Sequence, residues 1–221
     1  MKYYQKLTIL LALIWGFIAI QRIVIAIIMP AIQADIKFNY ADAGLIISVT
    51  GLIWAFGTII WASIGDHYGR LPVIVGCAIL ASVFSWMTGM VHALSSMLTV
   101  RGILGFFERR PWGPAISSVG EEAPEDKRSM VVSFIPGSFM LVGVCLGPML
   151  AVWLLTQCGS WQPVFYIIPI PGIILALIAA FFMHEPASVA EGIKARKSGQ
   201  KRVMMQQGQK VKLSDVLKYK T

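Results

Sequence analysis

Long runs of apolar residues, separated by short polar stretches, dominate the chain as far as about residue 183. A helix needs roughly 20 apolar residues to cross the hydrocarbon of a bilayer, and a helix satisfies its own backbone hydrogen bonds there. Six runs reach this length, and they cover residues 7–30, 41–64, 73–94, 97–119, 129–156 and 163–183. The pattern predicts an all-α membrane protein with six transmembrane helices.

The composition agrees with this prediction. Of the 221 residues, 57% are hydrophobic and 14% are charged, with a mean hydropathy of +0.71, whereas soluble domains average about 25% charged residues. The net charge is +8, but nine of the 19 lysines and arginines follow residue 190. The excess positive charge therefore belongs to a tail, and the rest of the chain lacks the polar surface that nucleic-acid binding requires.

Lysines and arginines in the connections predict the orientation, because cytoplasmic loops carry an excess of them. Six spans place both termini on one side of the membrane. With cytoplasmic termini, the outer loops hold only Lys37, and the inner side holds the basic tail together with Lys2, Lys6, Arg70, Lys127 and Arg128. We therefore expect both termini in the cytoplasm.

The tail differs from the rest of the chain. Residues 1–184 are expected to form the six-span unit, and residues 185–221 a central cytoplasmic loop. Apolar residues mixed with lysines near 209–219 predict a short amphipathic helix on an anionic inner leaflet. A solvated basic linker is the alternative.

Arg22, Arg101 and Glu108 are charged residues inside the predicted spans. Arg22, preceded by Gln21, falls near the centre of the first span, where an arginine costs about 2.5–3.5 kcal/mol on insertion scales and usually faces a cavity or a partner. Arg101 and Glu108 are seven residues apart in the fourth span, about two helical turns, so they share a face. These residues predict a charged wall inside the bundle.

Such a wall either lines a substrate or proton pathway or forms ion pairs that hold the helices together. Desolvation favours the protonated form of Glu108 and a nearby arginine favours its carboxylate, so movement of the arginine could load or release a proton. The surplus positive charge favours an anionic substrate, since a guanidinium pairs with a carboxylate through two hydrogen bonds. Arg109 and Arg110 point away from Glu108 on an ideal helix, and their roles have no explanation at this stage.

The connection between the second and third spans, GDHYGRLP at 65–72, resembles the G-x-x-x-D-R-x-G-R-R loop of the major facilitator superfamily. The matching positions are Asp66, Gly69 and Arg70, and the departures are Ala62, His67 and Leu71. The resemblance implies one six-helix half of a twelve-span transporter. It also implies that the loop latches the two halves in the outward-facing state.

A narrower resemblance is to the anion:cation symporters of that superfamily, which carry organic anions such as sugar acids. Their fourth span reads approximately R-x-x-x-G-x-x-E-x-x-x-x-x-P, similar to RGILGFFERRPWGP at 101–114. Their first span contains Asp-Arg; here Arg22 matches the arginine, and Gln21 occupies the position of the aspartate. The resemblance implies that Arg22, Arg101 and Gln21 bind substrate and that Glu108 couples transport to protons. Without the aspartate, fewer protons per cycle or a different coupling mode is implied.

The resemblance covers one half of a transporter, and a half cannot alternate access alone. It implies a missing C-terminal six-helix half, or a second half-transporter, as partner. A fragment or a truncated reading frame is favoured over a half that functions with a separate partner. The other expected partners are a small organic anion, protons and the lipid bilayer, and no nucleic acid. The expected location is a bacterial inner membrane.

Two alternatives to this function stay open. One is a sugar or drug transporter of the same superfamily, and the other is a non-transporting remnant or interaction partner. No metal-ligand cluster, nucleophile motif or cofactor motif is found in the sequence. We therefore expect no enzyme activity and no cofactor.

Overall fold

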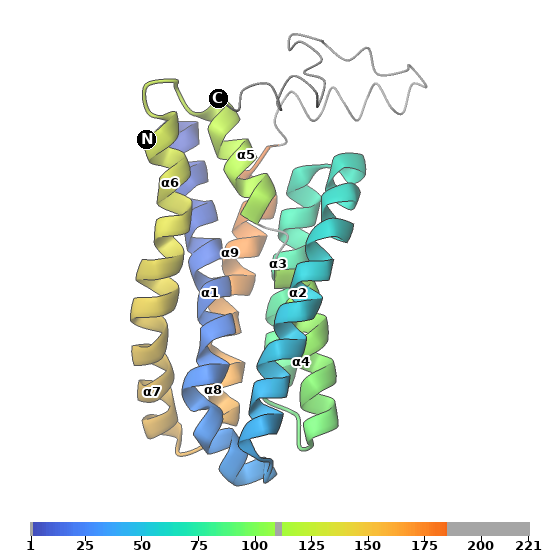
Figure 1. Ribbon diagram of the computed structural model, residues 1–221. Helices are drawn as coiled ribbons and strands as arrows, with labels where there is room; N and C mark the ends of the chain where they lie inside the picture. Colours follow the sequence, from blue (N-terminus) through green and yellow to red (C-terminus); the bar gives the residue numbers. More distant parts are fainter. Residues whose placement is uncertain (1, 109–111, 185–221) are drawn as a thin grey trace, which may run out of the picture.

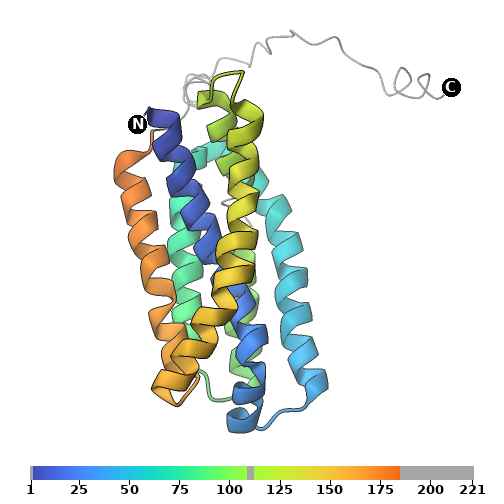
Figure 2. The ribbon, with the colours of Figure 1, turned by 90° about the vertical axis from the view of Figure 1, so that its left-hand side faces the viewer.

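A bundle of nearly parallel and antiparallel helices makes up the computed structural model, which describes residues 2–108 and 112–184 (Figures 1 and 2). Every element in these two ranges is a helix. In chain order they are α1 (Tyr3–Ile36), α2 (Tyr40–Tyr68), α3 (Arg70–Thr88), α4 (Leu94–Glu108), α5 (Trp112–Glu122), α6 (Arg128–Ser138), the π-helix η1 (Phe139–Leu146), α7 (Gly147–Cys158), α8 (Gln162–Ile167) and α9 (Pro169–Phe182). The prediction of an all-α membrane protein is confirmed.

Five helical segments of the described chain are long and apolar enough to cross a membrane. They are Tyr3–Ile36, Tyr40–Trp61, Leu71–Thr88, Arg128–Cys158 and Gln162–Phe182. The fourth predicted span, 97–119, falls on α4 and α5, with residues 109–111 outside the description. The predicted loop 185–221, with its amphipathic helix near 209–219, also lies outside the described residues.

The turn between α1 and α2 has a clear local cause. Lys37 ends α1 in the left-handed conformation, with φ of 59°, and its backbone N–H donates to the carbonyl of Gln33. Asn39 and Asp42 then exchange hydrogen bonds, because each backbone N–H donates to the other's side-chain oxygen, at 3.1 and 2.9 Å. This reciprocal capping starts α2 and reverses the chain direction.

Asp35 links the same end of α1 to the start of α8. Its Oδ2 accepts hydrogen bonds from Nε1 of Trp161 at 2.8 Å and from Nε2 of Gln162 at 3.0 Å. The indole of Trp161 is buried. The first and last spans of the bundle are therefore joined at the end opposite the N-terminus.

Helix α1 is the centre of the bundle and packs against α6, η1 and α7 on one side and against α3 and α9 on another. Small residues allow the closest approaches. A Cβ on Gly143 of η1 would overlap the Cβ of Ala19, and a Cβ on Gly16 would lie 2.8 Å from the Cβ of Val142. The π-helix ends at Leu146, and Pro148 follows after one residue, Gly147. Proline has no backbone N–H to continue an α-helical hydrogen-bond pattern.

Helices α2 and α4 also approach closely, and this contact yields a stability prediction. A Cβ on Gly105 would lie 2.5 Å from the carbonyl oxygen of Thr50, and backbone cannot move aside cheaply. We expect Gly105→Ala to lower the free energy of unfolding by about 1–3 kcal/mol, which exceeds alanine's helix-propensity gain of about 1 kcal/mol. Thermal unfolding in detergent micelles measures the change.

The control for this prediction is Gly76→Ala in α3. A Cβ on Gly76 would meet nothing within 4 Å, so only the propensity gain remains and the protein should be unchanged or slightly more stable. Equal unfolding temperatures for the two variants would show that the α2–α4 contact tolerates a methyl group.

Candidate functional site

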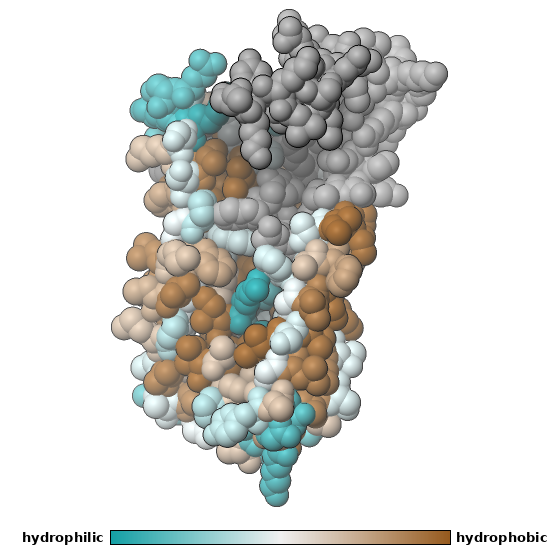
Figure 3. All heavy atoms as spheres, in the orientation of Figure 1, coloured by the Kyte–Doolittle hydropathy of each residue, from teal (hydrophilic) through white to brown (hydrophobic). Residues whose placement is uncertain are grey.

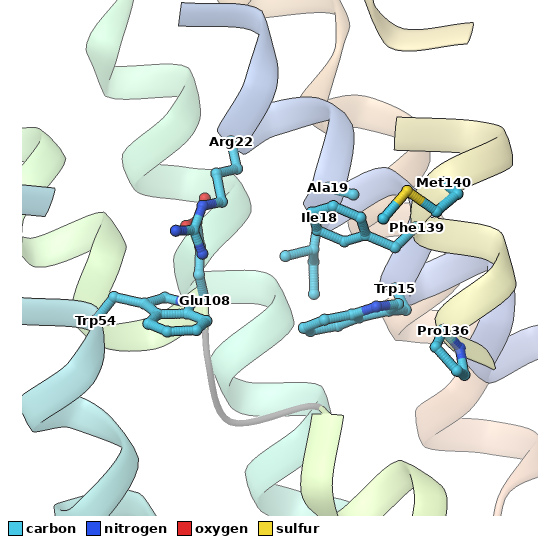
Figure 4. A pocket seen from close by; sticks show the side chains of 9 residues that line it. All are labelled: Trp15, Ile18, Ala19, Arg22, Trp54, Glu108, Pro136, Phe139 and Met140. Carbon is cyan, nitrogen blue, oxygen red and sulfur yellow. The ribbon is translucent and has the colours of Figure 1, made fainter. Parts of the chain in front are cut away.

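A cavity of about 420 Å³ lies beside the middle of α1, between this helix, α2, α4 and the α6–η1 segment. Its lining residues are Trp15, Ile18, Ala19, Arg22, Trp54, Glu108, Pro136, Phe139 and Met140. Figure 4 shows Arg22, Glu108 and Trp54 gathered on one side and the aromatic and apolar side chains of α1, α6 and η1 on the other. In Figure 3 a hydrophilic area is visible in a hollow of the otherwise mostly hydrophobic face.

Arg22 enters this cavity from α1. Its side chain is half-buried, and Cζ of the guanidinium lies 4.5 Å from the ring centroid of Trp54 on α2. This is a cation–π contact, in which the face of the indole attracts the positive charge. Arginine is suited to such stacking because its planar guanidinium is weakly hydrated. The contact holds the charged group at the cavity wall.

Glu108 and Arg101 come from α4, two turns apart, and each is only 1% exposed. Glu108 lines the cavity, whereas Arg101 lies behind the lining and donates from Nη1 to the carbonyl of Gln21 at 3.5 Å. Within the described ranges, neither carboxylate oxygen of Glu108 has a hydrogen-bond partner, nor does Nε of Arg101. Both Arg22 and Arg101 lie close enough to act electrostatically on Glu108.

The structure thus brings Arg22, Arg101 and Glu108 into one electrostatic group, and it directs Gln21 elsewhere. The side chain of Gln21 is 1% exposed, and its Nε2 donates to Oγ of Ser82 on α3 at 3.2 Å. Consecutive residues of a helix point about 100° apart, so Gln21 faces α3 and α9 while Arg22 faces the cavity. Only the backbone carbonyl of Gln21 takes part in the charged group, through Arg101.

The aromatic lining was missed by the sequence reasoning. Trp54 lies in the second span and Trp15 in the first, and nothing in their local sequence distinguishes a cavity-lining tryptophan from one that faces lipid. A partial signal existed for Trp15, which precedes Arg22 by seven residues and therefore shares its helix face. The contact of Trp54 with Arg22 could be found only from the packing of α2 on α4.

The loop motif is described in part. Gly69 has φ of 104° and immediately precedes α3, and this backbone conformation favours glycine. The side chains of Asp66 and Arg70 lie outside what the structure describes, and so do Arg109 and Arg110.

Comparison with known proteins places these features in a family. Residues 11–220 match the profile of the Major Facilitator Superfamily. The hexuronate transporter of Bacillus subtilis is 26% identical over 210 residues, which cover 91% of this chain and 46% of that protein. The cis,cis-muconate transport protein of Acinetobacter baylyi is 26% identical over 164 residues, covering 72% and 38%. A bicyclomycin resistance protein homologue of Haemophilus influenzae is 25% identical over 131 residues, covering 59% and 32%.

The fold comparison agrees. A crystal structure of a bacterial homologue of the human lysosomal transporter Spinster, inward-facing and unoccupied, superimposes with a TM-score of 0.74 at 23% identity, covering 84% of this chain and 44% of that one. The chain spans less than half the length of these relatives. Helical architecture, membrane-spanning segments and the profile match agree: the chain is a multi-pass membrane protein that belongs to the Major Facilitator Superfamily of transporters.

Proposed function

We propose that this chain forms the N-terminal half of a secondary active transporter that carries an organic anion, a carboxylate such as a sugar acid, by proton symport. The observation that supports this proposal most directly is that a guanidinium and a buried carboxyl group line the same cavity. Arg22 and Glu108 both line it, and Glu108 has no hydrogen-bond partner among the residues described.

The cavity suits a small carboxylate. Its volume of about 420 Å³ is within the roughly 300–1,000 Å³ of small-molecule sites. Arg22 offers a planar set of donors that pairs with both oxygens of a carboxylate. The apolar side chains of Ile18, Phe139 and Met140 line the same space, and an apolar environment strengthens such a charged hydrogen bond because it lowers the local dielectric constant.

Proton coupling follows from the same charges. With Glu108 ionised, its negative charge competes with an incoming anion for Arg22 and Arg101. Protonation removes that competition, so the anion binds more strongly to the protonated site. By linkage, the bound anion favours proton uptake to the same degree. Proton and carboxylate would then load and leave together, which is symport.

The proposal includes features beyond the described cavity. Alternating access needs a second six-helix half, supplied either by a continuation of this chain or by a separate chain. We place both termini in the cytoplasm and the protein in a bacterial inner membrane. Asp66, Gly69 and Arg70 would latch the two halves in the outward-facing state.

A second candidate function is drug transport. It is favoured by relatives such as the bicyclomycin resistance protein homologue and the multidrug resistance protein MdtL of Klebsiella pneumoniae, which is 25% identical over 162 residues. The hexuronate and muconate relatives favour the carboxylate instead. Two guanidinium groups, of Arg22 and Arg101, beside one carboxyl group favour an anion over a neutral or cationic drug.

Uptake by sealed vesicles tests the function. The chain would be expressed alone and with the C-terminal half of the Bacillus subtilis hexuronate transporter, and co-purification would verify assembly of the two halves. We expect a pH gradient, acidic outside, to drive accumulation of labelled glucuronate only in vesicles that hold both halves. The proposal would be overturned if the vesicles accumulated neutral glucose or exported ethidium instead of accumulating glucuronate. It would also be overturned if an assembled pair of halves transported nothing.

A further inference from the structure

A second groove lies at the end of the bundle that carries the N-terminus and shares no lining residue with the charged cavity. It has a volume of about 630 Å³ and runs between the first turns of α1 and the last turns of α9. The two helix ends lie side by side in both views of the bundle (Figures 1 and 2). Its walls are mostly aliphatic, and they include Leu7, Ile9, Leu10, Leu13, Ile178 and Phe182.

The polar groups of the groove gather at one end. Tyr3, Lys6 and His184 line its outer mouth, and all three side chains are exposed. The hydroxyl oxygen of Tyr3 accepts a hydrogen bond from the backbone N–H of His184 at 3.0 Å, and the two rings are in edge contact at 5.9 Å. The Tyr3 hydroxyl proton therefore stays available to donate, and Lys6 lines the same groove.

The dimensions of the groove fit one membrane leaflet. From Leu7 to Leu13 the apolar lining extends over six residues of α1, which is about 9 Å of helix. The hydrocarbon core is about 30 Å thick, so the apolar part of the groove fits within the roughly 15 Å of one leaflet. The cation and the hydrogen-bond donors lie at the end where lipid headgroups are found, and the aliphatic walls extend toward the bilayer centre.

We propose that this groove binds an anionic phospholipid of the cytoplasmic leaflet, with its phosphate at Lys6, His184 and Tyr3 and an acyl chain between α1 and α9. Charge complementarity selects this occupant over a neutral lipid, because basic residues attract anionic headgroups at the cytoplasmic surface. The leaflet follows from the proposed orientation. The binding itself does not depend on the proposed transport activity.

Cross-linking with a phosphatidylglycerol that carries a photoreactive acyl chain tests the proposal on the whole protein in lipid nanodiscs. Mass spectrometry of the digested protein reports the label on the α9 segment that contains Ile178 and Phe182. We expect the double variant Lys6→Gln, His184→Gln to lose about fivefold or more of this label, given the contribution of one basic residue near a membrane surface. A phosphatidylcholine probe with the same acyl chain should label the wild type as weakly as the phosphatidylglycerol probe labels the double variant.

Lys127→Gln is the matched control. Lys127 lies at the same end of the bundle but lines a different groove, with Tyr4 and Phe134, so its loss should leave the α9 label unchanged. Three results would overturn the proposal: equal labelling by the two headgroups, a label unaffected by the double variant, or an equal loss in Lys127→Gln. Absence of any α9 label from the phosphatidylglycerol probe would overturn it as well.

Discussion

Replacing Arg22 by lysine is expected to reduce glucuronate uptake about 100-fold in vesicles that contain both halves. Lysine keeps the positive charge but presents a point charge in place of a planar fork, and it does not stack on Trp54 as a guanidinium does. A hydrogen bond to a charged group is worth about 1.5–3 kcal/mol, so losing one or two accounts for this change. Initial uptake rates over a range of substrate concentrations provide the measurement.

Arg22 is a better test position than Arg101. Arg22 is half-buried at the cavity, whereas Arg101 is 1% exposed and bonded to the backbone of α1, so its replacement would disturb packing as well as binding. Arg128→Lys, at the exposed start of α6, is the matched control and should transport normally. Uptake by Arg22→Lys within twofold of the wild type would exclude paired recognition of a carboxylate by this side chain.

Glu108→Gln is expected to abolish accumulation driven by the pH gradient while substrate exchange across the membrane continues. Glutamine has nearly the same shape but neither binds nor releases a proton, so the site would behave as if it were permanently protonated. The accumulation ratio should fall to about one, since no coupling ion drives the substrate uphill. Gradient-driven uptake and counterflow exchange, measured on the same vesicles, separate the two effects.

The control for Glu108→Gln is Glu122→Gln, which changes an exposed carboxylate at the end of α5. That variant should retain both gradient-driven uptake and exchange. If Glu108→Gln accumulates substrate as the wild type does, the carboxyl group has a structural role and the proton is carried elsewhere.

The sequence predicted which segments form helices more accurately than where they end. The first apolar run covers 7–30, but α1 extends over Tyr3–Ile36, because apolarity marks the part of a helix in hydrocarbon and polar residues continue the same helix beyond it. The π-helix η1 was not predicted. It contains the close contact of Gly143 with Ala19 on α1. The four-residue spacing of Gly143 and Gly147 permits a close helix approach, but which helix they contact depends on the packing of the whole bundle.

For the site, helical periodicity was informative and adjacency in the chain was not. The seven-residue spacing correctly placed Arg101 and Glu108 on one buried face of α4. Gln21 was grouped with Arg22 because it occupies the aspartate position of the Asp-Arg pair in the resembled family, although a 100° rotation per residue separates the two side chains. Trp54 could not be predicted, since its place under Arg22 depends on how α2 packs beside α1 and α4.

The stacking of Arg22 on Trp54 has a consequence for how quickly a carrier can cycle. A cation–π contact is worth about 0.5–2 kcal/mol, less than a buried ion pair whose separation strands a charge. An arriving anion would have to overcome only this weak contact between Arg22 and Trp54. When the anion leaves, the guanidinium can return to the indole. When the site is empty, the guanidinium has a partner that holds it in place but is easily displaced, which suits repeated turnover.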